Sequence, residues 1–127
     1  MYCRMIYIMV ASLLWGLTNP FLKSGAAGLE NISHEKLLIN LFLKVKWLIS
    51  NPQFLIPFSI NQVGSVVYYY VLTIYPISIA VPVVNALTLL ITVVTGHFLC
   101  DELLSIRQTA GLLTIATGIV LCSLSNQ

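Results

Sequence analysis

Residues 77–99, ISIAVPVVNALTLLITVVTGHFL, run for 23 positions without an Asp, Glu, Lys or Arg. As an α-helix this run would extend about 35 Å, and the hydrocarbon core of a bilayer is about 30 Å thick. Three further apolar runs have a similar length and at most one charged residue each: 5–22, 54–75 and 104–124. The sequence therefore predicts an all-α membrane protein with four spans, forming one transmembrane domain over residues 1–127.

The overall composition excludes an ordinary soluble domain. Apolar residues make up 58% of the 127 positions and charged residues only 8%, whereas soluble domains carry about 25% charged residues. Too few charges remain to cover a water-facing surface, so we expect the lipid bilayer to be the main partner. The net charge of +2 is too small to indicate nucleic acid binding. A membrane β-barrel is not expected, because its strands would alternate in polarity and these runs do not.

The first run, 5–22, has one alternative interpretation. Arg4 followed by an apolar stretch is also typical of a secretory signal peptide. No clear cleavage site of small residues follows, and the run ends in the sequence NPFLK at 19–23. We therefore expect this run to be retained as a membrane helix.

The connector at 24–51 is the longest polar segment. Ser33 is the expected N-cap of a helix within it. Leucines and a valine then recur at helical spacing, and Lys44 and Lys46 fall on other faces. This pattern favours an amphipathic helix in the membrane interface, with Trp47 at headgroup depth. A connector folded against the bundle outside the membrane is the alternative.

The distribution of basic residues predicts the orientation. With four spans, the first and third loops share a side, and they hold five of the six basic residues, leaving only Arg4 on the other. Cytoplasmic loops are enriched in Lys and Arg, so we expect loop 24–51 to be cytoplasmic and both termini to face outward or into a lumen. Asn31 begins a glycosylation sequon, NIS, and its use would reverse this orientation.

Uncharged polar and small residues fall on one face of each of the first three spans. Polar groups in lipid need partners, so these faces are expected to point into the bundle. They predict a cavity near the bilayer midplane, lined by Trp15, Asn19, Asn61, Gln62, Tyr68, Pro82 and Asn85. The alternative is hydrogen bonding for helix packing alone, since such bonds contribute only about 0.6 kcal/mol each in membranes.

The fourth run carries a strip of small residues. Gly111, Thr114 and Gly118 are spaced by three and four positions and share one helix face. Such a strip lets another backbone approach closely. The partner could be a helix of the same chain, but four short helices bury little surface, so we favour contact with a second copy or a partner membrane protein.

The sequence offers no arrangement typical of catalysis. His34 and His97 lie near loop or span ends, and no span contains a carboxylate. The three cysteines form no CxxC pair and no metal-ligand spacing. We therefore expect no enzymatic activity, no catalytic residue, no metal site and no cofactor.

Several motifs resemble the drug/metabolite transporter superfamily. LLWG at 13–16 and NPFLK at 19–23 resemble the opening of its repeats, and AVP at 80–82 with the run into Asp101-Glu102 resembles a later helix. The segment from Gly111 to Gly118 resembles the glycine motif that forms dimers in the last helix of small multidrug resistance transporters. The resemblance implies that this strip mediates dimerisation.

Nearly the whole chain resembles the transmembrane protein 234 family. The similarity is carried by short motifs in the second and third spans: PF at 57–58, NQ at 61–62, GS at 64–65, YY at 68–69 and AVP at 80–82. It implies a multi-pass, four-helix bundle like a repeat of the drug/metabolite transporter superfamily, which includes EamA-like proteins. It does not specify a chemical activity.

One departure from the transporter pattern limits the functional prediction. Small multidrug resistance transporters carry an essential glutamate in the first helix, eight residues before the lysine that ends it. The corresponding position before Lys23 is Trp15, so proton-coupled export of cations is not expected. We predict a transporter-like protein that binds or moves a small neutral or polar solute as a dimer. The alternative is a structural or regulatory subunit of a membrane complex.

Overall fold

The computed structural model describes residues 2–99, 101 and 103–125. Five α-helices and one 3₁₀ turn follow each other along the chain: α1 (Tyr2–Gly25), η1 (Ala27–Asn31), α2 (Leu37–Ser50), α3 (Pro52–Ile74), α4 (Ile77–Leu99) and α5 (Ile106–Ser125). The described residues contain no β-strand. The prediction of an all-helical protein is confirmed.

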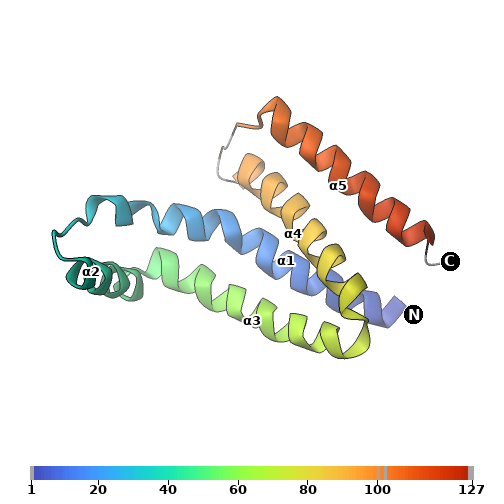
Figure 1. Cartoon of the computed structure of the whole chain (residues 1–127), viewed down its shortest axis with the longest axis horizontal. Coiled ribbons are helices and arrows are strands. Elements are labelled where there is room, and N and C mark those ends of the chain that lie inside the picture. The colour runs from blue at the N-terminus through green and yellow to red at the C-terminus, as the bar shows by residue number, and fades with distance from the viewer. Residues whose placement is uncertain (1, 100, 102, 126–127) are drawn as a thin grey trace.

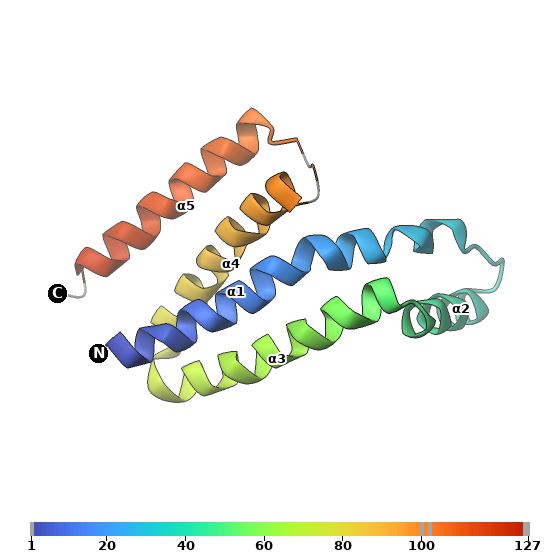
Figure 2. The ribbon, with the colours of Figure 1, turned by 180° about the vertical axis from the view of Figure 1, so that it is seen from behind.

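Helix α1 is the central element of the fold. It packs along both α3 and α4. The turn at Tyr75 and Pro76 joins the end of α3 to the start of α4, and the two helices diverge away from it (Figure 1). Among the described elements α5 packs alongside α4 alone, and it forms an outer layer in both views (Figure 2). The described helices therefore form a three-helix core of α1, α3 and α4, with α5 attached through α4 and α2 attached at the start of α3.

Among the described residues, three helical segments are long and apolar enough to cross a membrane: Cys3–Asn31, which covers nearly all of α1 and η1, and helices α3 and α4. The fourth predicted run, 104–124, is also helical, but its described apolar part, Ile106–Cys122, is shorter. Three of the four predicted spans thus meet the length and composition of a membrane helix.

Small residues allow the core helices to approach closely. A Cβ atom built on Gly16 of α1 would lie 2.5 Å from Cβ of Ile91 and 3.1 Å from the carbonyl oxygen of Thr88, both on α4. A Cβ atom on Gly64 of α3 would lie 2.8 Å from the indole of Trp15. Without a driving force from water, membrane helices associate through such close packing.

The outer surface of the bundle is strongly apolar. The fully buried apolar side chains are few and small, Ala11, Val71, Ala80 and Val84. Large apolar side chains cover the outside instead, for example Val66 on α3 and Leu113 on α5, each about two-thirds exposed. This distribution suits a protein surrounded by acyl chains, which solvate apolar side chains as well as a protein core does.

Helix α2 begins later than expected. The prediction that Ser33 caps it is wrong, because the helix starts at Leu37 with Lys36 at the N-cap and no side-chain cap. The N–H of Lys36 donates to Nδ1 of His34 over 3.2 Å, which holds this segment in a turn before the helix. In Figures 1 and 2 α2 lies beside the start of α3 and is strongly foreshortened, so it runs transverse to α3.

A capping box marks the start of α5. The N–H of Ser105 donates to Oε1 of Gln108 over 2.8 Å, and the N–H of Gln108 donates to Oγ of Ser105 over 3.3 Å. This reciprocal pair satisfies backbone donors at a helix N-terminus. Asp101, in the preceding turn, adopts a left-handed conformation with φ 51°, which Asp tolerates better than most residues. The neighbouring Glu102, part of the quoted motif, lies outside the described residues.

Candidate functional site

A closed polar network joins α1 to α3. Nδ2 of Asn61 donates to Oγ1 of Thr18 over 2.8 Å, and Thr18 in turn donates to the carbonyl oxygen of Leu14 over 2.6 Å. Nε1 of Trp15 donates to the carbonyl oxygen of Asn61 over 3.1 Å. Asn61 and Trp15 therefore each form a hydrogen bond to the opposite helix, so both polar side chains have the partners that a bilayer environment requires.

Tyr68 completes the α1–α3 contact. Its ring lies 4.9 Å from the ring of Trp15, measured between centroids, at an interplanar angle of 49°. Both side chains are half-buried, and Gly64 provides the space beside the indole. Three of the predicted cavity residues are thus brought together, because Trp15 contacts both Asn61 and Tyr68.

A second polar pair joins α1 to α4. Nδ2 of Asn19 donates to Oγ1 of Thr92 over 3.1 Å. One turn along α4, the hydroxyl of Thr88 is buried without a partner among the described atoms. Asn19 and Thr92 also line a cavity of about 200 Å³, which Lys23, His97 and Gln108 border as well. This small polar cavity lies where α1, α4 and the start of α5 meet.

The remaining predicted cavity residues face outward. Gln62 on α3 and Pro82 and Asn85 on α4 are exposed. Neither Gln62 nor Asn85 makes a hydrogen bond with any residue that the structure describes. Both lie within about 5 Å of the midpoint of their helices, at a rise of 1.5 Å per residue. Within one copy the seven residues do not line a common cavity.

Crossing geometry explains why the polar stripe of α4 is divided. This stripe consists of the small and polar residues at steps of three and four along the helix: Ser78, Pro82, Asn85, Thr88, Thr92 and Gly96. Helix α4 diverges from α3 and crosses α1 (Figure 1), so the side that faces α1 changes along its length. Thr88 and Thr92 therefore meet α1, whereas the first half of the stripe remains exposed.

The glycine strip of α5 is open. No described atom lies within 4 Å of a Cβ built on Gly111 or Gly118. Thr114 is exposed, and its hydroxyl donates to the carbonyl oxygen of Ala110 in its own helix over 2.9 Å. The strip is thus available to a partner and plays no part in the fold of the single chain.

Asn51 marks the break between two helical patterns, and the structure gives it a further role that the sequence did not predict. Its Oδ1 accepts from the N–H of Gln53 over 3.1 Å, and its Nδ2 donates to the carbonyl oxygen of Gly25 over 3.0 Å. One side chain thus caps α3 and fastens its start to the end of α1. The sequence Asn-Pro between two helical patterns was the available signal, because Asn is favoured at N-caps and Pro at the first helical position.

Side chains that commonly bind metals are not clustered in the part of the chain that the structure describes. Over residues 2–99, 101 and 103–125, no group of three or more His, Cys, Asp or Glu side chains is placed to hold a metal ion. The thiols of Cys3 and Cys122 are both exposed and lie near opposite ends of the sequence. The hydrogen bonds of Trp15, Asn19 and Asn61 involve amides, hydroxyls and an indole, while Lys23 and His97 border the cavity beside Asn19.

The long apolar helices and their uncharged polar contacts define a multi-helix membrane protein. The family described as "Putative transmembrane family 234" matches residues 8–123. A "Transmembrane protein 234 homolog" from Anopheles gambiae is 35% identical over 117 residues, 92% of this chain and 84% of the relative. A homologue of the same description from Dictyostelium discoideum is 31% identical over 119 residues, 94% of this chain and 93% of the relative.

The chain therefore belongs to transmembrane family 234. This confirms the family suggested by the sequence motifs and the membrane location. No solved structure matches the chain. The relation to the drug/metabolite transporter superfamily stays a prediction.

Proposed function

We propose that the protein works as a transporter-like assembly of two copies in the membrane and binds a small neutral or polar solute. The observation that carries this proposal is the outward position of Gln62 and Asn85 near the middle of their helices. An amide without hydrogen bonds in a hydrocarbon environment costs about 4 kcal/mol or more. Contact with a second chain, or with a polar path between two chains, removes this cost.

The exposed area of the chain supports an assembly. One copy exposes 9048 Å², whereas a compact monomer of its 14.0 kDa mass would expose about 6,700 Å² by the usual scaling. A stable protein interface buries about 800 Å² per partner. The excess area is therefore large enough for such an interface, with the open strip at Gly111 and Gly118 as one contact surface.

The polar cavity beside Asn19 supports the solute-binding part of the proposal. At about 200 Å³ it lies below the usual range of ligand pockets, which is about 300–1,000 Å³. It suits a small solute held by hydrogen bonds from Asn19 and Thr92. Since no carboxylate lines it, a neutral solute fits better than a cation.

A structural or regulatory subunit is the second candidate function. The closed network of Asn61, Thr18 and Trp15 favours it, because these groups already satisfy one another and leave little capacity for a ligand. In this case the open faces of α4 and α5 would bind a different membrane protein rather than a second copy.

Replacing Asn85 by leucine tests the assembly. We expect at least a tenfold rise in the dissociation constant, measured by energy transfer between labelled copies in vesicles, with unchanged or higher thermal stability of the diluted monomer. Val63→Leu, on an exposed part of α3, is the matched control. Unchanged energy transfer in Asn85→Leu would contradict the proposal. A constant heterologous partner in crosslinked native membranes would instead favour the subunit.

We also propose that α5 is a fourth span and that loop 24–51 is cytoplasmic. The 20 residues of α5 extend about 30 Å, which matches the hydrocarbon thickness. The excess of basic residues on the loop side supports the orientation. The exposed, transverse helix α2, with Trp47 packed against Gly28, would then lie in the cytoplasmic interface.

Labelling from one side of the membrane tests this topology. In a variant without native cysteines, Ser33→Cys should react with an impermeant maleimide only after the cells are permeabilised. Ser125→Cys, at the end of α5, should react in intact cells. Labelling of Ser33→Cys in intact cells, or glycosylation of Asn31 in the parent chain, which keeps Ser33, would reverse the orientation. Labelling of both cysteines from one side would exclude a fourth span.

A further inference from the structure

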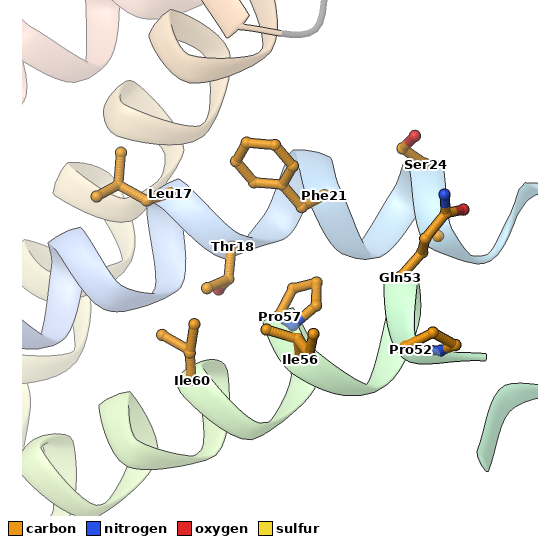
Figure 3. A pocket seen from close by; sticks show the side chains of 10 residues that line it. Leu17, Thr18, Phe21, Ser24, Pro52, Gln53, Ile56, Pro57 and Ile60 are labelled. Carbon is orange, nitrogen blue, oxygen red and sulfur yellow. The ribbon is translucent and has the colours of Figure 1, made fainter. Parts of the chain in front are cut away.

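An apolar groove lies between the end of α1 and the start of α3. Its volume is about 620 Å³, within the range of about 300–1,000 Å³ for pockets that hold small molecules. Leu17 and Phe21 line it from α1, and Ile56, Pro57 and Ile60 line it from α3 (Figure 3). These residues belong to two membrane helices, so the groove is open to the bilayer.

The two ends of the groove differ in polarity. Thr18 lies at the end marked by Leu17 and Ile60 (Figure 3), but its hydroxyl is engaged with Asn61 and Leu14. Ser24 and Gln53 lie at the other end from Leu17 and Ile60 (Figure 3). The backbone carbonyl of Gln53 adds to the polarity of this end. It receives no helical hydrogen bond from Pro57, one turn later, because proline has no N–H. An occupant thus meets apolar walls along most of its length and polar groups at one end.

This polar end lies at the membrane surface. Helix α1 ends at Gly25 and α3 begins at Pro52, next to the transverse helix α2 (Figure 2). The apolar end lies deeper in the span. From Leu17 to Gly25 the groove follows α1 over about 12 Å. The order of polarity matches that of a lipid, whose glycerol and ester groups lie at the interface and whose chains lie inside.

We propose that the groove holds one acyl chain of a membrane glycerophospholipid, with Ser24 and Gln53 forming hydrogen bonds to its ester region. The two polar side chains at the outer end are a hydroxyl and an amide, both neutral. They suit an ester better than the carboxylate of a free fatty acid, which would require a cation.

The groove and the proposed assembly surface are separate. Gln62 is two residues from Ile60, and therefore about 200° further around α3. The lipid site depends only on α1 and α3 crossing the membrane, and it does not require a second copy. A failed assembly test would therefore not contradict the lipid site, and a failed lipid test would not contradict the assembly.

Photocrosslinking of the full chain tests the site. The purified protein is reconstituted in phosphatidylcholine vesicles that contain a fraction of phosphatidylcholine with a diazirine on one acyl chain. After irradiation, adducts are mapped by mass spectrometry. We expect them to concentrate on the groove residues of α1 and α3, and Ile60→Trp, which fills the groove, should lower their yield at least fivefold.

Val66→Trp is the matched control, because Val66 is on α3, 70% exposed and outside the groove. It should leave the adduct yield unchanged. Leu17→Trp fills the groove from the opposite wall and replaces Ile60→Trp if that variant does not fold. Adducts spread evenly over all exposed faces, with no loss in either filled variant, would overturn the proposal. Displacement of the adducts by an equimolar free fatty acid would also overturn it.

Discussion

Replacing Gly16 by leucine is expected to separate α4 from α1 and to lower the free energy of unfolding by about 3 kcal/mol, the upper part of the usual range for overpacking. The Cβ atom alone would lie 2.5 Å from both Cβ and Cγ2 of Ile91 and 3.1 Å from the backbone oxygen of Thr88. Backbone atoms cannot move aside as a flexible side chain can, so the helices must shift. Equilibrium unfolding in mixed detergent micelles measures the loss.

Gly111→Leu is the control for this prediction. It makes the same chemical change in a membrane helix, but no described atom lies within 4 Å of the new Cβ. Diluted to monomers, this variant should unfold like the parent chain, whereas its self-association should weaken. Equal unfolding energies for Gly16→Leu and Gly111→Leu would show that α1 and α4 do not meet at Gly16.

The spans were predictable from the sequence because their signal is simple. A stretch such as 77–99 is long, apolar and uncharged, and only a helix satisfies its backbone within lipid. The structure has α4 at these same bounds. Start and end signals were also readable where they are strong, as at Asn51 and Pro52, which separate α2 from α3. The prediction of a helix start at Ser33 was wrong because a potential cap residue alone does not determine where a helix begins.

The spacing of the polar residues did not predict which of them contact a neighbouring helix and which are exposed. Asn61 and Asn85 are the same residue type at similar depth, yet Asn61 contacts α1 and Asn85 is exposed. Periodicity identifies a face of a helix but not the neighbour of that face. Helix crossing then divides even a continuous stripe, as it does between Asn85 and Thr88. The contact between Asn19 and Thr92, by contrast, joins two faces that the spacing had grouped correctly.

Trp15→Ala is expected to cause a loss of stability similar to that of Gly16→Leu, through the other side of α1. Truncating a large aromatic side chain costs about 3–5 kcal/mol in a protein core. Trp15 is half-buried, so we expect the lower end, about 3 kcal/mol. The indole packs against Tyr68 and over Gly64, and its removal leaves a gap between α1 and α3.

Trp15→Phe separates the ring contact from the hydrogen bond. Phenylalanine retains an aromatic ring beside Tyr68 but cannot donate to the carbonyl oxygen of Asn61. The cost should fall to about 1 kcal/mol, since hydrogen bonds between membrane helices average about 0.6 kcal/mol. Chemical unfolding of both variants in the same micelles gives the comparison. If phenylalanine costs as much as alanine, the indole N–H rather than the aromatic packing holds α1 to α3, and the polar network then determines the stability of this contact.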